Sequence, residues 1–286
     1  MRIVLIANPV AGGDARARIE RARAWFAANG AAVELVLTGR AGDARRTAAA
    51  LRSGGCDRLV VAGGDGTLNE VINGLAPSPL PVAFLPLGTT NVFALEAGIP
   101  RDIDPACRVA LEGTPRPVCL GRADGERFLL MASAGFDAAV VHRVDLAWKR
   151  QAGKLAYFTS ALTALRKVPL TGFEVSGDDG LVRSTCQVVA GNARFYGGRF
   201  SLTPTASLFA ERLDVCLFRP MGKFPFLISA LFLAAGLTPR GVERFTTRAL
   251  VLRGAPVPLQ LDGDPQGTLP RTLTVTAGEI VLVLPR

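Results

Sequence analysis

The chain has 286 residues, of which 49% are hydrophobic, so it is not a disordered protein and is long enough for two domains. Its 33 Lys and Arg residues exceed its 24 Asp and Glu residues, and the net charge of +9 favours an acidic partner such as a nucleotide or an anionic membrane. No basic run contains interleaved aromatic residues, so we expect no nucleic-acid partner. Five scattered cysteines without a Cys-x-x-Cys pair favour a reducing, cytoplasmic compartment.

The first third of the chain alternates short apolar strands with helices. Strands are expected at Ile3 to Ile6, Val33 to Leu37, Leu59 to Ala62 and Val82 to Leu85, and helices at about 14–29, 43–52, 67–75 and 92–97. This alternation predicts a parallel sheet, in which ligands bind beyond the carboxyl ends of the strands. Four loops should meet at that edge: Asn8 to Gly13, Thr38-Gly39, Gly63 to Thr67, and Pro86 to Asn91.

The loop Gly63-Gly64-Asp65-Gly66-Thr67 organises this half. Its glycines lack the Cβ atoms that would keep a phosphate from the backbone N–H groups, and the following helix begins with its positive end at the loop. Because the Asp65 carboxylate repels phosphate unless a cation stands between them, the loop predicts a nucleotide phosphate with Mg²⁺. No Walker A sequence is present, which excludes P-loop chemistry.

After about Pro117 the chain changes to short strand candidates separated by Gly, Pro and Asp, a spacing typical of a β-sandwich. The candidates are 118–122, 127–132, 172–175, 185–190, 213–218 and 249–252. A helix is expected between about Gly153 and Arg166. A last strand, 279–284, can pair with either domain.

Several motifs together resemble the diacylglycerol kinase catalytic-domain family of bacterial lipid kinases, which are related to sphingosine kinases. They are Asn8-Pro9-x-Ala11-Gly12, Gly63-Gly64-Asp65-Gly66-Thr67, Pro86-x-Gly88-Thr89-x-Asn91-x-Phe93-Ala94, Ser133-Ala134-Gly135-Phe136-Asp137, Gly153 with Tyr157, Gly191-Asn192 before Tyr196-Gly197-Gly198, Pro204-x-Ala206, Leu213-Asp214-Val215 and Leu261-Asp262-Gly263-Asp264. They cover most of the chain.

The resemblance implies an α/β plus β fold. Residues 1–117, completed by the strand 279–286, would form a Rossmann-like nucleotide domain similar to that of NAD kinase and phosphofructokinase. Residues 118–278 would form a β-sandwich domain for the lipid substrate. It further implies an ATP-dependent kinase that phosphorylates diacylglycerol or a similar lipid alcohol in the cleft between the domains. Such an enzyme would be cytoplasmic and peripheral at the inner face of the membrane.

The resemblance also implies the site residues. Those assigned to ATP are Asn8, Pro9, Gly12, Thr38, Gly63, Gly64, Asp65, Gly66, Thr67, Asn69, Glu70, Gly88, Thr89 and Asn91. Asp65 would contact Mg²⁺ through the Mg-ATP complex. Asp262 and Asp264 would supply the base that activates the lipid hydroxyl, and the sequence leaves open which of the two it is.

The chain departs from the family pattern at four places. Val92 replaces a second Asp, and Gly13 stands where a basic residue is common. Asp264 replaces a Glu. Ala210 and Glu211 replace the Asp-Gly that contributes to a structural metal site, so we expect that metal to be absent.

Two other functions stay open. The central loop is also similar to that of NAD kinases, which phosphorylate a soluble dinucleotide. A non-catalytic nucleotide- or lipid-binding relative is the other alternative.

Apolar and basic residues near 221–240 predict peripheral membrane binding. Asp137 is either a headgroup ligand or a helix cap. The single histidine, His142, gives no support for a catalytic triad. A homodimer also stays open.

Overall fold

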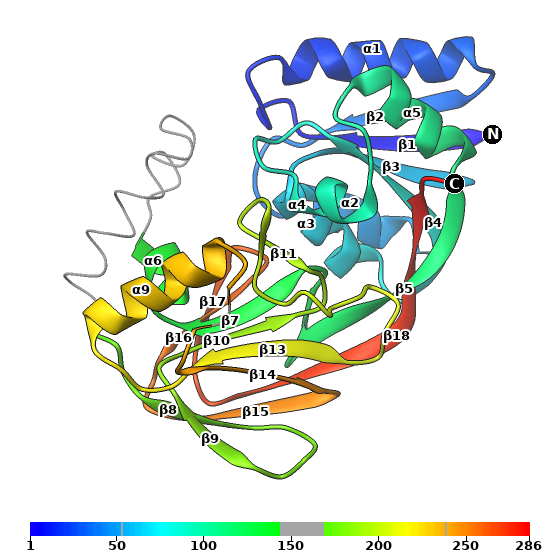
Figure 1. Ribbon diagram of the computed structural model, residues 1–286. Coiled ribbons are helices and arrows are strands. Elements are labelled where there is room, and N and C mark those ends of the chain that lie inside the picture. Colours follow the sequence, from blue (N-terminus) through cyan, green and yellow to red (C-terminus); the bar gives the residue numbers. More distant parts are fainter. Residues whose placement is uncertain (53, 144–168, 238) are drawn as a thin grey trace. The chain divides into compact units, whose positions relative to one another are not determined.

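The computed structural model describes residues 1–52, 54–143, 169–237 and 239–286, and the expected helix at 153–166 lies outside them (Figure 1). The chain divides into two compact units. The first comprises Met1–Leu120, Gly197–Arg199 and Thr276–Arg286, and the second Gly121–Tyr196 and Phe200–Val275.

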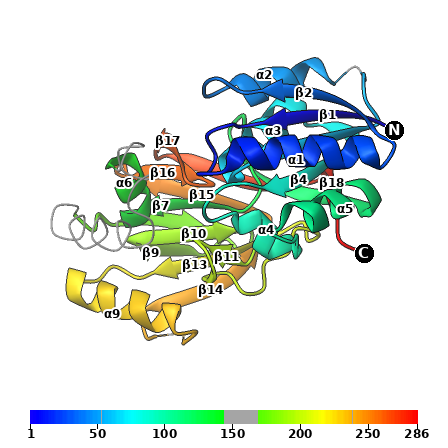
Figure 2. The same cartoon turned by 90° about the horizontal axis from the view of Figure 1, so that it is seen from above.

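The first unit is a parallel α/β structure with the strand order β2-β1-β3-β4-β18. Its elements are β1 (Arg2–Ala7), α1 (Ala15–Ala28), β2 (Ala32–Leu37), α2 (Asp43–Ala50), β3 (Arg58–Gly63), α3 (Asp65–Leu75), β4 (Ser78–Pro86), α4 (Val92–Ala97), α5 (Ile103–Glu112) and the start of β5 (Thr114–Ala123). Helix α1 packs against α5, and α2 against α3 (Figures 1 and 2). The four predicted strands are confirmed, and β3 is buried along its whole length, as expected for a central parallel strand.

The second unit contains two antiparallel sheets. One continues the sheet of the first unit and has the order β18-β15-β8-β9, the other has the order β14-β13-β10-β7-β16-β17, and β11 pairs separately with β12. Its elements are β6 (Glu126–Phe128), β7 (Met131–Gly135), α6 (Phe136–Arg143), β8 (Phe173–Ser176), β9 (Val182–Thr185), β10 (Gln187–Gly191), β11 (Phe195–Tyr196), β12 (Phe200–Ser201), β13 (Leu213–Phe218), α9 (Lys223–Ala234), β14 (Val242–Thr247), β15 (Ala249–Gly254), β16 (Pro258–Leu261), β17 (Asp264–Thr268) and the start of β18 (Arg271–Leu284).

Strand β13 shows how this unit is layered. Alternate residues Leu213, Val215 and Leu217 join a core that also contains side chains of β8 and β15, so they fill the space between the two sheets. The intervening Cys216 and Phe218 instead join a second cluster with side chains of α6 and α9. The period-two alternation of a strand thus separates a sandwich core from a layer of helices.

The last strand, whose pairing the sequence left open, pairs in both units. Its residues Arg271 to Thr274 run antiparallel to β15, and Ile280 to Leu282 run parallel to β4.

Two helices that the sequence analysis did not list each contain a proline in the first turn. In α5 the proline is Pro105 and in α9 it is Pro225, in both cases the third residue of the helix. A first-turn residue needs no N–H for an intrahelical hydrogen bond, so proline is tolerated there. Helix α9 ends at Ala234, and Gly236 just beyond it has a φ of +79°.

Other differences concern strands and a cap. The strand expected at 127–132 is two strands, β6 and β7, and β14, β16 and β17 were not predicted. Strand β17 contains Pro265, which an edge strand tolerates because its N–H groups need no ladder partner. Asp14 occupies the expected N-cap position of α1 but makes no capping hydrogen bond through its side chain.

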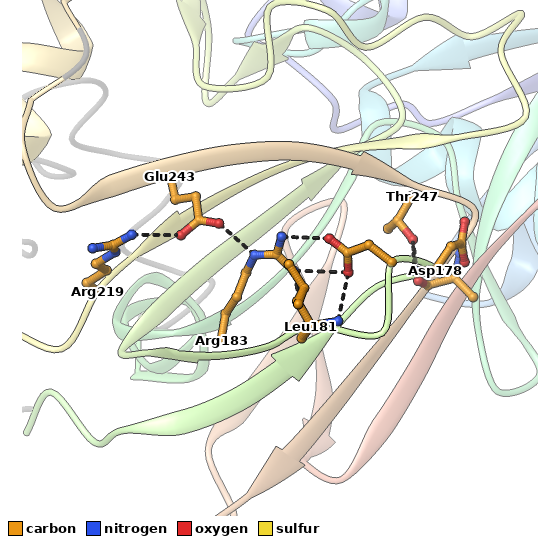
Figure 3. A network of polar contacts seen from close by, with 8 residues as sticks. Asp178, Leu181, Arg183, Arg219, Glu243 and Thr247 are labelled. Carbon is orange, nitrogen blue, oxygen red and sulfur yellow. Dashed lines mark hydrogen bonds and ion pairs between the residues drawn. The ribbon is translucent and has the colours of Figure 1, made fainter.

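A charged network connects the two sheets of the second unit (Figure 3). Arg183 of β9 donates to Glu243 of β14 at 2.6 Å and to Asp179 at 2.7 Å. The Arg183 side chain is only 13% exposed and lies over the Phe245 ring, 4.1 Å from its centre. These hydrogen bonds from Arg183 lower the pKa of both carboxyl groups.

Candidate active site

The four predicted loops leave the first sheet at one edge. Strand pairing aligns Ala7 with both Leu37 and Ala62, and Gly63 with Pro86. Because these strands are parallel, the residues that follow them emerge together. The predicted grouping of the loops is confirmed.

The glycines of these loops serve two purposes. A Cβ atom at Gly12 would lie 2.6 Å from the Leu87 carbonyl oxygen, and one at Gly88 would lie 2.8 Å from the Gly64 Cα atom. These glycines let neighbouring loops pack against each other. At Gly13 and Gly66, by contrast, a Cβ atom would meet nothing within 4 Å. The backbone at these two positions is therefore open to an approaching ligand.

Asn8 and Thr67 connect the first and third loops. The Asn8 Nδ2 atom donates to Thr67 Oγ1 at 3.4 Å, and Asn8 Oδ1 accepts from the backbone N–H of Val10 at 3.1 Å. Asn8 thereby fixes the turn that contains Pro9. In the second loop, Thr38 Oγ1 donates to the Ala7 carbonyl oxygen at 3.5 Å.

Asp65 holds the fourth loop. Its carboxylate accepts the backbone N–H groups of Val92 at 2.8 Å and Phe93 at 3.0 Å, which lie in the first turn of α4. Burial raises the pKa of the Asp65 carboxyl, while the two amide donors act in the opposite direction. Both oxygens of Asp65 therefore already have protein partners, and a Mg²⁺ contact through Asp65 stays a prediction.

The remaining polar residues assigned to ATP have structural partners of their own. Glu70 accepts the Gly42 N–H at 2.9 Å, and Asn69 Oδ1 accepts from Asn73 at 2.6 Å. Asn91, with a φ of 51°, donates through Nδ2 to the Gly88 carbonyl oxygen at 2.6 Å.

Two arginines support the loop that contains exposed Thr89. Arg18 of α1 donates to the carbonyl oxygens of Pro86 at 3.2 Å and Arg101 at 2.6 Å. Arg101 in turn donates to the carbonyls of Thr89 and Thr90, at 3.2 and 2.8 Å. Both arginines line a hollow together with Arg21 and Asp102. Apart from the excess of basic residues, no pattern in the sequence pointed to Arg101.

In the second unit, the two candidate catalytic residues Asp262 and Asp264 differ in hydrogen bonding and in exposure. Asp262 and Gly263 form the two-residue turn between β16 and β17, with φ values of 50° and 90°. The Asp262 carboxylate accepts three backbone N–H groups, from Leu129 at 2.7 Å, Leu130 at 2.9 Å and Met131 at 2.8 Å. Asp264 follows the turn and is exposed.

Asp137, in the first turn of α6, belongs to a polar network. Its carboxylate accepts from Ser133 Oγ at 2.6 Å, Gln187 Nε2 at 2.7 Å, the Ala138 N–H at 2.7 Å and the Tyr196 hydroxyl. Asp137 is the second residue of α6, so its bond from the Ala138 N–H supports the first turn from within the helix and not from the N-cap position. A headgroup contact stays a prediction.

Among the described residues, no group of three or more His, Cys, Asp or Glu side chains is placed to hold a metal ion. Asp214, four residues after Ala210, is buried and accepts from both the N–H and the hydroxyl of Thr205, at 2.9 and 2.7 Å. The expected absence of the family's structural metal stays a prediction.

Comparison with known proteins agrees with this architecture. Residues 2–123 match the diacylglycerol kinase catalytic domain, and residues 131–284 match the YegS C-terminal NAD kinase beta sandwich-like domain. The chain is 30% identical to a diacylglycerol kinase of Bacillus subtilis (strain 168), covering 100% of this chain and 97% of the relative.

Two further comparisons extend the likeness. A probable lipid kinase YegS-like protein of Pseudomonas aeruginosa (strain PAO1) is 34% identical, covering 93% of this chain and 90% of that protein. The crystal structure of a diacylglycerol kinase from Bacillus anthracis str. Sterne has the same fold, with a TM-score of 0.78, 22% identity, and coverage of 99% and 96% of the two chains. The predicted fold class, a Rossmann-like domain followed by a β-sandwich, is thus confirmed. The chain belongs to the diacylglycerol kinase catalytic-domain family of lipid kinases.

Proposed function

We propose that the protein transfers the γ-phosphoryl group of ATP to the hydroxyl of diacylglycerol or a similar lipid alcohol. The observation that carries the ATP assignment is the meeting of four loops at one sheet edge, with open backbone at Gly13, just before α1, and at Gly66, in the first turn of α3. Backbone N–H groups at a helix N-terminus favour phosphate. The hydrogen bonds that Asn8, Asp65 and Arg101 make with neighbouring loops hold these loops in place before ATP binds.

Phosphoryl transfer depends mainly on positioning and charge neutralisation, with a carboxylate that accepts the proton of the attacking hydroxyl. We assign this proton to Asp264, because it is exposed, while Asp262 accepts three backbone N–H groups. Asp262 would then position the turn that carries the base. Mg²⁺ would enter with the nucleotide and neutralise phosphate charge, and the roles assigned here concern only the side chains of this chain.

Labelled ATP tests the assignment. The protein is incubated with γ-labelled ATP and either vesicles that contain diacylglycerol and other lipid alcohols, or NAD. Label in a lipid supports the proposal, and label in NAD supports the NAD kinase alternative. Binding of ATP without any labelled product would identify a non-catalytic relative.

A membrane-bound substrate requires access to the bilayer, and we assign this contact to α9. No helix in the described part of the chain is long and apolar enough to cross a membrane. One face of α9 packs inside the second unit through Phe226 and Leu233. On the opposite face, Phe224, Ile228 and Leu231 are 73%, 37% and 55% exposed. A surface helix normally keeps its outer face polar.

The charges around α9 favour an anionic lipid surface as the occupant of this face. The segment from Pro220 to Val242 contains no Asp or Glu, and it includes the exposed basic residues Lys223 and Arg240. Each basic residue near an anionic membrane contributes about 1 kcal/mol, and salt screens that contribution.

Sedimentation with anionic vesicles at low and high salt tests this contact. We expect the double variant Phe224→Glu/Leu231→Glu to lower vesicle binding at least about tenfold, since burying each apolar side chain contributes about 1.5–3 kcal/mol. Leu181→Glu, at another exposed apolar position, should bind like the wild type. Equal binding by all three proteins, or no binding by the wild type, would exclude α9 as the membrane contact.

A further inference from the structure

Strands β7 and β16 place Ser133 and Gln260 directly opposite each other in an antiparallel pair. Their neighbours Ala132, Ala134, Leu259 and Leu261 belong to the sandwich core. By strand alternation, Ser133 and Gln260 therefore face the other side of this sheet. Their relative exposures are only 1% and 2%, so each polar atom depends on a protein partner.

The hydrogen bonds between these residues have a defined direction. Asp137 is a carboxylate and can only accept, so the Ser133 hydroxyl must donate to it over their 2.6 Å contact. Since that hydroxyl has a single hydrogen, its oxygen can only accept from Gln260 Nε2, at 2.7 Å. The Gln260 Oε1 atom is then oriented to accept the Gly263 N–H, at 2.6 Å.

Gly263 separates Asp262 from Asp264, so this chain of bonds ends inside the turn that carries the proposed base. At the other end, Asp137 is held by Gln187, Tyr196 and the Ala138 N–H. If the Gln260 side-chain amide were rotated by 180°, its NH₂ group would face the Gly263 N–H and two donors would meet without an acceptor. Such an arrangement costs free energy in a buried site. The hydrogen bond from Ser133 to Asp137 thus determines which atom of Gln260 the turn meets.

We propose that Asp137 is a positioning residue that acts through Ser133 and Gln260 to hold the Asp262-Gly263-Asp264 turn in its catalytic conformation. The proposal rests on the proposed function, because it assumes that Asp264 acts on the lipid hydroxyl. The side chains of Asp137, Ser133 and Gln260 need not touch the substrate. They determine where Asp264 stands when the substrate is bound.

The first test replaces Gln260 by Leu, which removes both side-chain hydrogen bonds at similar size. A displacement of about 1 Å can cost about 100-fold in rate. We expect Gln260→Leu to lower kcat by about 10- to 100-fold and to leave KM for ATP within about twofold. Thr203→Val is the control, since it removes a buried hydrogen bond to the Ala193 carbonyl in the same unit. That control should lose stability but keep kcat.

The second test uses Gln260→Glu, whose effect should depend on pH. An ionised Glu cannot donate to Ser133, whereas a protonated Glu can donate to Ser133 and still accept from Gly263. The kcat of Gln260→Glu relative to the wild type should therefore rise as the pH falls from about 8 to about 5.5. The same ratio for Gln260→Leu should not change with pH. A purely structural role would not separate the two variants in this way.

Hydrogen exchange supplies a readout that is independent of activity. The Gly263 amide should exchange at least about tenfold faster in Gln260→Leu than in the wild type, because its acceptor is gone. An inactive wild type would refute the proposed function, and the exchange rates would still test the connection to Gly263. If wild-type protein is active and Gln260→Leu keeps kcat within twofold, or if Gly263 exchange is unchanged, the inference is wrong.

Discussion

Exchanging each of the two turn carboxylates for its amide separates a structural role from a catalytic one. Asn-Gly is a preferred pair for a two-residue hairpin turn, and Asn tolerates the positive φ of 50° at position 262. Asp262→Asn therefore leaves the backbone unstrained and alters only the side-chain bonds. The amide oxygen can still accept two of the three N–H groups, but the NH₂ group meets the third as a second donor.

The expected loss of stability follows from the loss of one hydrogen bond to the Asp262 carboxylate. A hydrogen bond to a charged group contributes about 1.5–3 kcal/mol, so Asp262→Asn should destabilise the protein by about 2–3 kcal/mol. In a unit of this size about 1 kcal/mol corresponds to about 2–4 °C, so Tm should fall by about 4–12 °C. Asp264→Asn should leave Tm within about 2 °C, because the residue is exposed, but lower kcat at least about 100-fold.

Thermal melts and initial rates at saturating ATP and lipid distinguish the two variants. If Asp262→Asn melts like the wild type and its kcat is about 100-fold lower, Asp262 is the base and Asp264 is not. If both variants keep near-normal kcat, the turn is structural and the base lies elsewhere.

Three further results are expected. Asp65→Asn should raise KM for ATP and lower stability by about 1–2 kcal/mol, since one of its two bonds to α4 is lost; loss of activity with an unchanged Tm would instead indicate direct contact with Mg-ATP. Arg183→Met should lower Tm by about 2–4 °C. Because Arg183 lowers the pKa of Asp179 and Glu243, their contribution to stability is present above their unfolded pKa values and lost as the pH falls through the folded ones. The acid-side fall of Tm below about pH 4 should thus be smaller in Arg183→Met, and an unchanged pH profile would contradict the network. Metal analysis after dialysis without nucleotide should find no tightly held Mg²⁺, whereas a stoichiometric ion would mean that backbone oxygens ligate it.

The features that the sequence predicted well are local ones. Buried parallel strands such as β3 read as unbroken apolar runs, and the glycine loops interrupt them at the right places. The order of these elements was enough to predict that the loops meet at one edge, because parallel strands end on the same side of a sheet.

The partners of the candidate side chains could not be predicted in this way. Leu129, Leu130 and Met131 precede Asp262 by 133, 132 and 131 residues, and nothing near the Asp-Gly turn identifies them. The same holds for Asp65 and its partners in α4. A carboxylate in a glycine loop has the same sequence appearance whether it binds a cation or accepts backbone N–H groups.

At position 92, where the chain has Val in place of the family's second Asp, the backbone and not the side chain supports the loop. Val92 reaches Asp65 through its backbone N–H, which any residue except proline supplies, and its side chain is buried. Loss of the family's second Asp therefore leaves the support of the loop intact and removes only a carboxylate. Asp43 likewise accepts the N–H groups of Gly39 and Arg40 beside Thr38. At this sheet edge Asp65 and Asp43 hold the loops in place through backbone N–H groups, so the proposed binding of the ATP phosphates would depend mainly on backbone N–H groups and basic side chains.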